Sequence, residues 1–429
     1  MIAIGYLPEG LLESPYANGF YDRLREPMGE LTGKRILLGV TGGVAAYKAA
    51  ELVRLLVKAN AEVEVVLSAA GARFVGSATF QALSGNPVWQ DLWDERVPDS
   101  MAHIELGRRA DAIVVAPASA DFLAKLACGL ADDLLSTLCL ARPAGETALL
   151  VAPAMNREMW DKPATRRNVA RLREDGVVLL GPASGAQACG ETGPGRMLEA
   201  GELLEEIVAA FQPRSLAGRR LLVTAGPTYE PLDPVRGLTN RSSGRMGHAL
   251  ARAAAEAGAR VTLVSGPVSL PVPAGVERVD VLTARDMREA VLASLAGTDV
   301  FVAVAAVCDF RPAETSPHKV KKEGASLALR LARNPDILAE VAARADAPFC
   351  VGFAAETENL EEHAEAKRRA KHLPLLVGNL VSRGMGGEDS TVVLFDDEGI
   401  HPLAPGSKRE IARRLVAEIA ARLPARSRD

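Results

Sequence analysis

Apolar residues gather along the chain in short runs, and stretches with helical spacing separate these runs. In the first half the runs that follow a buried-strand pattern are 35–40, 62–67, 112–116, 148–151 and 177–180. An amphipathic helix should follow the first strand and end near Lys58. Strands that alternate with helices in this way predict a parallel, doubly wound α/β sheet.

The same pattern restarts after a break at 211–218. Pro213 and Gly218 stand in this break, between two periodic segments, and predict a linker. A closing helix should begin near Ser407. Strands of the second half are expected at 220–224, 260–264, 300–305, 349–353, 375–377 and 391–395. We therefore predict two Rossmann-like domains, at 31–212 and 213–429. A loose extension at 1–30 precedes them, in which Met28 is a candidate translation start.

Composition narrows the class of protein. The 429 residues are 48% hydrophobic, which supports two buried cores, and the net charge of −4 argues against nucleic acid or an anionic membrane as partner. None of the five cysteines forms a CxxC pair, which argues against a disulfide framework and a zinc site. No run reaches the length of a membrane span and no signal-peptide pattern opens the chain, so we expect a cytoplasmic protein.

Both halves run from a strand through glycine-rich sequence into a helix. Gly42 and Gly43 suit a mononucleotide phosphate site, because glycine lets backbone N–H groups approach an anion at a helix N-terminus. The G-x-G-x-x-G fingerprint is absent there, and the second half lacks G-x-x-x-x-G-K-[ST]. Such glycine pairs are often only tight turns, so both interpretations stay open.

The segment 152–160 follows the strand predicted at 148–151. Ligands of open α/β sheets bind beyond the carboxyl ends of strands, which makes this loop a candidate site. Asn156 carries an amide that can donate and accept at once, suited to holding a carboxylate. The alternative is that Asn156 only caps the following helix.

Other side chains could carry chemistry. His103 can hold a proton near neutral pH, although a lone histidine is more often structural. Cys189 lies in a glycine-rich flap and is the cysteine that we expect to be reactive. The other four cysteines have apolar neighbours and should be buried: Cys128, Cys139, Cys308 and Cys350.

Basic residues cluster in the second half. Beyond the strand at 300–305 the chain carries charged residues that together favour binding of a triphosphate: Asp309, Arg311, Lys319, Lys321 and Lys322. Lys367 and Lys371 share one helix face. Both groups could instead be solvated surface.

Taken together, these motifs resemble a known family. The segments 41–48, 103–107, 153–156 and 187–197 resemble the homo-oligomeric flavin-containing cysteine decarboxylases, which implies a flavodoxin-like first domain. The second half resembles phosphopantothenate–cysteine ligases, through 224–228, 230–236, 242–247, 264–268, 319–322, 334–337 and 351–357. The whole is similar to the bacterial bifunctional enzymes of coenzyme A biosynthesis, over roughly 33–425.

For the first half the resemblance implies FMN-dependent decarboxylation of 4′-phosphopantothenoyl-cysteine. FMN would oxidise the thiol to a thioaldehyde, an electron sink for loss of CO2, and then reduce the resulting enethiol. His103 matches the active-site histidine, Asn156 the residue that holds the substrate carboxylate, and Cys189 the final proton donor. The positions that match FMN contacts are Gly42, Gly43, Val44, Ser68, Ser119 and Ala120.

For the second half the resemblance implies that 4′-phosphopantothenate attacks CTP, giving an acyl-cytidylate that cysteine then captures. Mg²⁺, whose ligands the motifs do not identify, and lysines would neutralise the phosphates. Lys319 matches the catalytic lysine, and Asn240 the residue that turns over the acyl-cytidylate. The matching nucleotide contacts are Ala303, Ala305, Asp309, Lys319, Pro335, Asp336, Ile337, Leu338, Phe353, Lys367 and Lys371.

The family also implies a homo-oligomer, with ligase dimers, decarboxylase trimers, flavin sites at subunit contacts and a dodecamer as the full assembly. Asp132 and Arg241 depart from its pattern. Two other classes compete. An NAD(P)-linked oxidoreductase should carry the missing G-x-G-x-x-G. A flavin-binding regulatory protein of this fold has an acidic tail, whereas this chain ends in the basic segment 422–429.

Overall fold

The structure is a computed structural model that describes residues 29–94, 96, 101–321, 328–356, 360–380, 389–390 and 392–424. The extension expected at 1–30 lies almost entirely outside the described residues, as does Met28. The chain divides between Phe211 and Gln212 into two compact units. No helix in the described ranges is long and apolar enough to cross a membrane.

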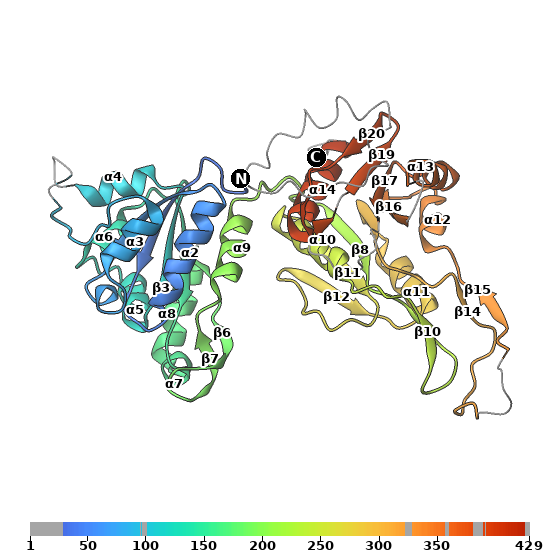
Figure 1. Ribbon diagram of the computed structural model, residues 1–429, viewed down its shortest axis with the longest axis horizontal. Coiled ribbons are helices and arrows are strands. Elements are labelled where there is room, and N and C mark those ends of the chain that lie inside the picture. The colour runs from blue at the N-terminus through green and yellow to red at the C-terminus, as the bar shows by residue number, and fades with distance from the viewer. Residues whose placement is uncertain are drawn as a thin grey trace, which may run out of the picture. The chain divides into compact units, whose positions relative to one another are not determined.

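The first unit contains a five-stranded parallel sheet in the order β2-β1-β3-β4-β5. Figure 1 labels its central strand, β3. This order is the flavodoxin-like arrangement, which confirms the predicted fold class. The strands are β1 Arg35–Val40, β2 Glu62–Leu67, β3 Ala112–Ala118, β4 Ala148–Pro153 and β5 Val178–Leu179. All five predicted strands exist. β3 and β4 continue two residues beyond the apolar runs, toward the segments predicted to bind ligands.

Helices cover both faces of this sheet, and alternate strand residues supply two cores. Leu38 and Val40 belong to one core with α2 and α9, whereas Leu37 and Ile113 belong to the other with α5, α6 and α8. The helices are α2 Ala46–Lys58, α3 Ser77–Ser84, α4 Ala102–Arg109, α5 Ala120–Cys128, α6 Leu134–Ala141, α7 Arg157–Asp161, α8 Pro163–Glu174 and α9 Ala200–Ala210, with a 3-10 turn at Gly71–Arg73. Because successive residues of a strand face opposite sides, the near-continuous apolar runs match a sheet buried on both faces.

A β-hairpin carries the glycine-rich flap. Its strands are β6 Ala183–Ala186 and β7 Thr192–Arg196, which the glycine content had hidden. The base of the hairpin is held by Lys48, a buried side chain of α2. Its Nζ donates to the Met197 carbonyl at 3.2 Å and to Glu199 Oε1 at 2.8 Å. The hydrogen bond from Lys48 is the main reason that the pKa of Glu199 lies below its usual value.

The second unit contains an eight-stranded sheet in the order β12-β11-β8-β13-β16-β17-β19-β20. The first six strands are parallel to one another. β19 then pairs antiparallel with β17, and β20 pairs antiparallel with β19. The strands are β8 Arg220–Ala225, β11 Arg260–Ser265, β12 Val276–Asp280, β13 Val300–Ala303, β16 Phe349–Glu356, β17 Leu375–Leu380, β19 Val392–Asp396 and β20 Gly399–Pro402. The predicted Rossmann-like fold is confirmed, although the edge strands β12 and β20 were not predicted.

Five helices cover the second sheet within the described ranges. α10 and α14 pack into the core on one face, and α11, α12 and α13 into the core on the other. Their bounds are α10 Arg245–Glu256, α11 Ala284–Ser294, α12 Ile337–Ala342, α13 Leu360–Ala370 and α14 Lys408–Arg422. The closing helix begins as predicted, because Ser407 is its N-cap and accepts from the Glu410 N–H.

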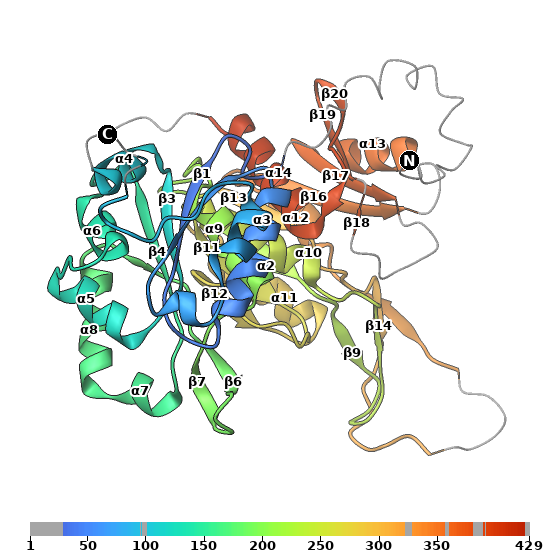
Figure 2. The ribbon, with the colours of Figure 1, turned by 60° about the vertical axis from the view of Figure 1, so that its left-hand side comes forward.

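Short antiparallel pairs extend from the second sheet. β9 Tyr229–Pro231 pairs with β10 Gly237–Thr239, and β14 Phe310–Pro312 pairs with β15 Leu331–Arg333. β9 and β14 contact each other, and together they project from the sheet (Figure 2). We call these four strands and their connections the arm. A third pair joins β18 Asp389–Ser390 to β21 Gly406–Ser407.

Candidate functional site

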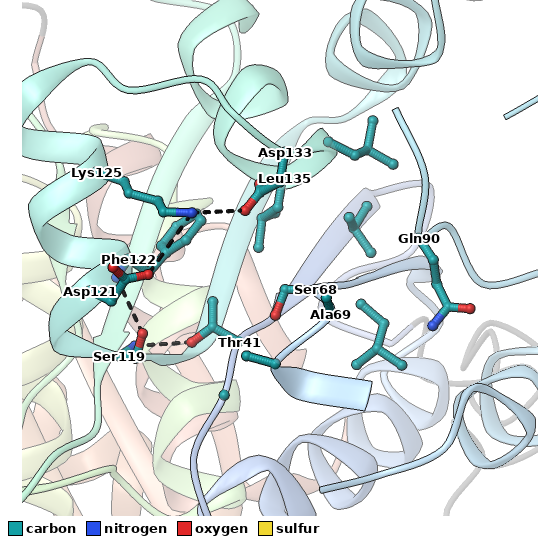
Figure 3. A pocket seen from close by; sticks show the side chains of 15 residues that line it. Thr41, Ser68, Ala69, Gln90, Ser119, Asp121, Phe122, Lys125, Asp133 and Leu135 are labelled. Atoms are coloured by element: carbon teal, nitrogen blue, oxygen red, sulfur yellow. Dashed lines mark hydrogen bonds and ion pairs between the residues drawn. The ribbon is translucent and has the colours of Figure 1, made fainter. Parts of the chain in front are cut away.

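A cavity of about 260 Å³ lies at the carboxyl ends of β1, β2 and β3 (Figure 3). In this strand order the gap between β1 and β3 is the topological switch point, where ligands of such sheets bind. Thr41 bridges it, since its Oγ1 donates to the Pro117 carbonyl at 2.8 Å and accepts from the Ser119 N–H at 3.0 Å. The cavity therefore lies at a crevice between the ends of β1 and β3, which Thr41 links by hydrogen bonds.

The residues expected around FMN fall at or beside this cavity. Gly42, Ser68 and Ser119 line it, and Gly43, Val44 and Ala120 are their neighbours in sequence. A Cβ on Gly42 would lie 2.7 Å from Ala70 Cβ, so a side chain does not fit there. Gly43 has φ +154° and open space around its missing Cβ. The turn therefore leaves room for a group held by backbone N–H groups.

Charged side chains that the pattern did not reveal also line the cavity. Lys125 Nζ lies 2.8 Å from Asp132 Oδ1 and 3.4 Å from Asp133 Oδ2. Hydrogen bonding to Asp132 is the main cause that raises the pKa of Lys125. Asp133 also caps α6 through the Ser136 N–H. The departure at Asp132 thus has a structural role as partner of Lys125.

Asn156 caps the following helix and also donates to a carboxylate of the protein. Its Oδ1 accepts from the N–H groups of Glu158, at 2.8 Å, and Met159, at 3.3 Å, and so caps α7. Its Nδ2 donates to Cys189 Sγ at 3.4 Å and to Glu191 Oε2 at 2.6 Å. The structure therefore brings Asn156 and Cys189 together, and adds Glu191 to them.

The flap hairpin is attached to the Asn156 loop by further bonds. The Met155 N–H donates to the Gly195 carbonyl and the Arg157 N–H to Gln187 Oε1, each at 2.9 Å. Cys189 is exposed, as expected of a reactive thiol. Of the four cysteines expected to be buried, Cys128 is also exposed, so that prediction was wrong for it. Cys128 is the last residue of α5, and it lies off the buried face of this helix, which Phe122, Leu123 and Ala127 form.

His103 is not part of this group within one chain. It lies in α4, which packs on α6 and lies at the opposite end of the first unit from α7 in both views (Figures 1 and 2). Its Nδ1 is buried and has no hydrogen-bond partner among the residues that the structure describes. Within one chain, the helix that carries His103 therefore lies away from the helix that Asn156 caps.

In the second unit, Asn240 lies at the ends of β8 and β13. Its Nδ2 donates to the Ala306 carbonyl at 3.0 Å, and the Ala306 N–H donates to the Gly226 carbonyl at 2.9 Å. The first turn of α10 also lies close to the end of β8. Gly247 in α10 permits this approach, because a Cβ at Gly247 would lie 2.5 Å from Ala225 Cβ. Ala303 ends β13 and Ala305 follows it, so both belong to this edge.

The remaining positions expected to contact the nucleotide gather beside this edge. The Asn334 N–H donates to the Asp309 carbonyl at 2.8 Å, which places the turn at Pro335 next to the end of β13. Lys367 Nζ donates to the Phe353 carbonyl at 3.2 Å, and Lys371 Nζ lies 2.6 Å from Asp336 Oδ2. Asp336 caps α12, whose first residues Ile337 and Leu338 are buried.

Asp336 keeps its negative charge in this cluster. Burial alone would raise the pKa of its carboxyl, but the hydrogen bond from Lys371 and the charges of both lysines outweigh burial and lower it. Lys367 and Lys371 are therefore not simply solvated.

Lys319 lies on the arm, between β14 and β15, and its side chain is exposed. The next residue is fixed from two sides: the Val320 N–H donates to Asp233 Oδ2 at 3.1 Å, and Arg236 Nη2 donates to the Val320 carbonyl at 2.8 Å. The Asp233 side chain is fully buried, and the hydrogen bond from Arg236 holds its pKa well below the usual value. Asp233 lies in the segment 230–236 that carries the resemblance, but no role was predicted for it, and Lys322 lies outside the described residues.

If this unit carries out the CTP-dependent release of pyrophosphate that the sequence resemblance implies, Asp233→Asn should lower kcat/KM for that step roughly tenfold, because the neutral amide cannot hold Arg236 and Val320 in place beside Lys319. The folded pKa of Asp233 is lowered from 3.8. Its contribution is therefore present above that value and lost as the pH falls through the folded pKa. Glu314→Gln, at an exposed carboxylate of the same arm, is the control. Wild-type kinetics of the Asp233 variant would contradict the positioning role.

The fold and cavity of the first unit define a flavodoxin-like flavoprotein, joined to a second Rossmann-like unit. The family described as Flavoprotein matches residues 24–212, and the family described as DNA/pantothenate metabolism flavoprotein C-terminal domain matches residues 216–423. The chain also matches curated proteins named Coenzyme A biosynthesis bifunctional protein CoaBC. Those of Vibrio parahaemolyticus and Escherichia coli K12 are 46% and 47% identical, over 91% and 93% of this chain and 99% of each relative.

The relative from Bacillus subtilis is 43% identical over 91% of this chain and 98% of its own length. The chain belongs to this family of coenzyme A biosynthesis bifunctional proteins. It is a flavin-dependent bifunctional enzyme with decarboxylase and ligase activities. Family membership therefore favours the enzyme over the oxidoreductase and regulatory alternatives.

Two solved structures each resemble part of the chain. The C-terminal domain of a coenzyme A biosynthesis bifunctional protein is 39% identical, with 48% of this chain and 97% of that one covered and a TM-score of 0.43. A PPC decarboxylase mutant complexed with pantothenoylaminoethenethiol is 34% identical, with 41% and 96% covered and a TM-score of 0.37.

Proposed function

We propose that residues 213–429 join cysteine to 4′-phosphopantothenate at the expense of CTP, and that residues 31–212 decarboxylate the product with FMN. The observation that carries the decarboxylase assignment is the contact of Asn156 Nδ2 with Cys189 Sγ at 3.4 Å. It places an amide donor for a carboxylate beside a thiol that can donate a proton. CTP is a cytoplasmic nucleotide, so we place both steps in the cytoplasm.

The cap fixes how Asn156 presents its amide. Because Oδ1 accepts two backbone N–H groups of α7, the NH₂ group must face the flap. There it would hold the carboxylate of 4′-phosphopantothenoyl-cysteine until CO2 leaves. Cys189 would then protonate the carbon skeleton during the final reduction. A bound flavin supplies a reversible two-electron acceptor for these steps.

The cavity at β1 and β3 fits a flavin mononucleotide. Gly42, Gly43 and Val44 would surround the phosphate with backbone N–H groups, in the open space beside Gly43, where no atom lies within 4 Å of a Cβ position. Ser68, Ser119 and Ala120 would complete the site at the ends of β2 and β3. Thr41 would support them by holding those strand ends together.

The position of α4 supports a shared active site. Since His103 lies at the opposite end of its unit from Asn156, we propose that a second copy of the chain supplies this histidine. Its buried Nδ1 without a partner in the described structure would then be satisfied or used across a subunit contact. This arrangement agrees with the homo-oligomer expected for the family, with decarboxylase trimers, ligase dimers and a dodecamer as the full assembly.

In the ligase step the carboxylate oxygen of 4′-phosphopantothenate attacks the α-phosphate of CTP, and pyrophosphate leaves. The cysteine amine then attacks the acyl carbon, and CMP leaves. Lys319 would stabilise the charge that develops on the phosphates, and Asn240 would orient the acyl-cytidylate. The nucleotide would lie against Ala303, Ala305, Asp309, Pro335, Asp336, Ile337, Leu338, Phe353, Lys367 and Lys371.

Magnesium would enter this site with the nucleotide. The described residues contain no group of three His, Cys, Asp or Glu side chains that could hold a metal ion. Mg²⁺ commonly binds through substrate phosphates, water and only one or two carboxylates. We therefore propose that MgCTP is the substrate and that Lys319, Lys367 and Lys371 neutralise the remaining charge.

The full chain with 4′-phosphopantothenate, cysteine, CTP and Mg²⁺ tests both activities in one reaction, followed by mass spectrometry. We expect 4′-phosphopantetheine, CMP, pyrophosphate and CO2. Replacement of CTP by ATP tests the choice of nucleotide, and release of the bound flavin by acid followed by chromatography tests for FMN. Absence of 4′-phosphopantetheine, while supplied 4′-phosphopantothenoyl-cysteine still loses CO2, would contradict the ligase assignment alone.

A further inference from the structure

Glu191 occupies the position on Asn156 where the proposed mechanism needs the substrate. Its Oε2 accepts from Asn156 Nδ2 at 2.6 Å, the shortest contact of that amide. Glu191 is exposed and lies on the flap hairpin, two residues after Cys189. A carboxylate of the protein therefore already satisfies the donor that is proposed to hold a carboxylate of the substrate.

The amide of Asn156 has no further hydrogen to offer. An asparagine NH₂ group donates two hydrogen bonds, and here one goes to Glu191 and the other to Cys189 Sγ. The amide cannot turn over, because its Oδ1 is held by two N–H groups of α7. A substrate carboxylate can bind Nδ2 only after one of these partners has moved away.

The flap holds Glu191 in this place through its own turn. The Gln187 N–H donates to the Glu191 carbonyl at 2.8 Å, and Gln187 Oε1 accepts from the Arg157 N–H at 2.9 Å. The Gly190 N–H donates to the Gln187 carbonyl at 3.0 Å. These bonds connect the backbone of Glu191 to the first residue of α7, so the carboxylate is positioned by the closed hairpin.

We infer that Glu191 is a latch that holds the flap closed on Asn156 in the free enzyme and that the substrate carboxylate displaces. The inference rests on the proposed role of Asn156. Substrate binding would exchange one carboxylate for another on Nδ2 and release Glu191 into solvent. Loss of CO2 removes the substrate carboxylate that had displaced Glu191, so Glu191 returns to Asn156 as the product forms. Glu191 is thus a positioning residue that weakens substrate binding and does not oppose product release.

The test uses two ligands that differ only in the carboxylate. 4′-Phosphopantothenoyl-serine carries the carboxylate but has no thiol to oxidise, and 4′-phosphopantothenoyl-ethanolamine lacks both. Their dissociation constants are measured by calorimetry on the full, flavin-loaded chain, for wild type and Glu191→Gln. The neutral glutamine is a weaker acceptor than a carboxylate, so the substitution should lower the dissociation constant of the serine ligand roughly fivefold. The dissociation constant of the ethanolamine ligand should change less than twofold.

A matched control separates the latch from general charge effects. Glu158→Gln removes one negative charge from α7, where the carboxylate pairs with Lys162 at 3.7 Å, and leaves the Nδ2 contacts in place. Glu158→Gln should leave the dissociation constants of both ligands within twofold of their wild-type values. Equal tightening by Glu158→Gln and Glu191→Gln, or equal effects of Glu191→Gln on the two ligands, would overturn the inference. Unchanged binding of the serine ligand by the Glu191 variant would overturn it as well.

Asn156→Ala in the same assay separates this inference from the proposed function. If Asn156 holds the substrate carboxylate, the alanine variant should lose the preference for the serine ligand. If it keeps that preference, the role of Asn156 is wrong, whatever Glu191 does. If the preference is lost but Glu191→Gln binds as wild type does, the role of Asn156 stands and the latch fails. Faster reaction of Cys189 with a thiol reagent in Glu191→Gln would report the opening of the flap independently of ligands.

Discussion

Asn156→Asp should lower the rate of CO2 release from 4′-phosphopantothenoyl-cysteine by roughly 10²- to 10³-fold. The aspartate keeps an oxygen for the Glu158 and Met159 N–H groups, so the cap on α7 survives. It replaces the NH₂ group by an oxygen that faces Glu191 and, on the proposed function, the substrate carboxylate, and like charges at this range repel. Trapping of ¹⁴CO2 from labelled substrate measures the effect.

The chain supplies its own control for this substitution. On the proposed function, pyrophosphate release with CTP and 4′-phosphopantothenate belongs to the other unit, and it should stay at the wild-type rate. Retention of the flavin absorbance after gel filtration would show that the cavity at β1 and β3 is intact. If the variant releases CO2 as wild type does, Asn156 does not hold the carboxylate, and its function is that of a helix cap alone.

Lys319→Gln should lower the rate of pyrophosphate release roughly 10²-fold, since loss of one charge that stabilises a developing anion has effects of this size. Glutamine keeps most of the length of the side chain and removes only the charge. The Lys319 side chain is exposed, so we expect no change in the unfolding midpoint. The measurement is a coupled pyrophosphate assay at saturating CTP and 4′-phosphopantothenate.

Lys321→Gln is the matched control, because Lys321 is an exposed lysine two residues away on the same arm. Decarboxylation of supplied 4′-phosphopantothenoyl-cysteine should be normal in both variants. A normal rate for Lys319→Gln, or an equal loss in Lys321→Gln, would show that the arm contributes only general positive charge.

Predictions from the sequence succeeded where local pattern decides the structure. β1 and β2 match the predicted runs residue for residue, because β1 is buried on both faces and because Val63, Val65, Val66 and Leu67 keep β2 largely apolar although it is an edge strand. β12 was missed because Glu277, Arg278 and Asp280 interrupt its apolar pattern, and none of its five residues is buried. The flap hairpin was missed because its strands consist largely of small residues and glycine, which have low strand propensity.

The sequence predicted only part of the candidate site, because several of its contacts join segments that are distant in the chain. The motifs placed Asn156 and Cys189 in one site, and the structure shows that they touch. Glu191 and Asp233 act through contacts between segments distant in the chain, and neither stands out by periodicity or composition. The position of α4 is likewise a property of the folded unit, so only the structure showed that His103 lies away from Asn156.

The cap on α7 has a consequence for which amino acids the chain can tolerate at position 156. Serine, threonine, aspartate and asparagine all terminate helices well, because each offers an oxygen to the first free N–H groups. Asparagine alone among them still has two N–H donors after that oxygen is engaged. A library of all twenty residues at this position should therefore yield several folded proteins and a single active decarboxylase.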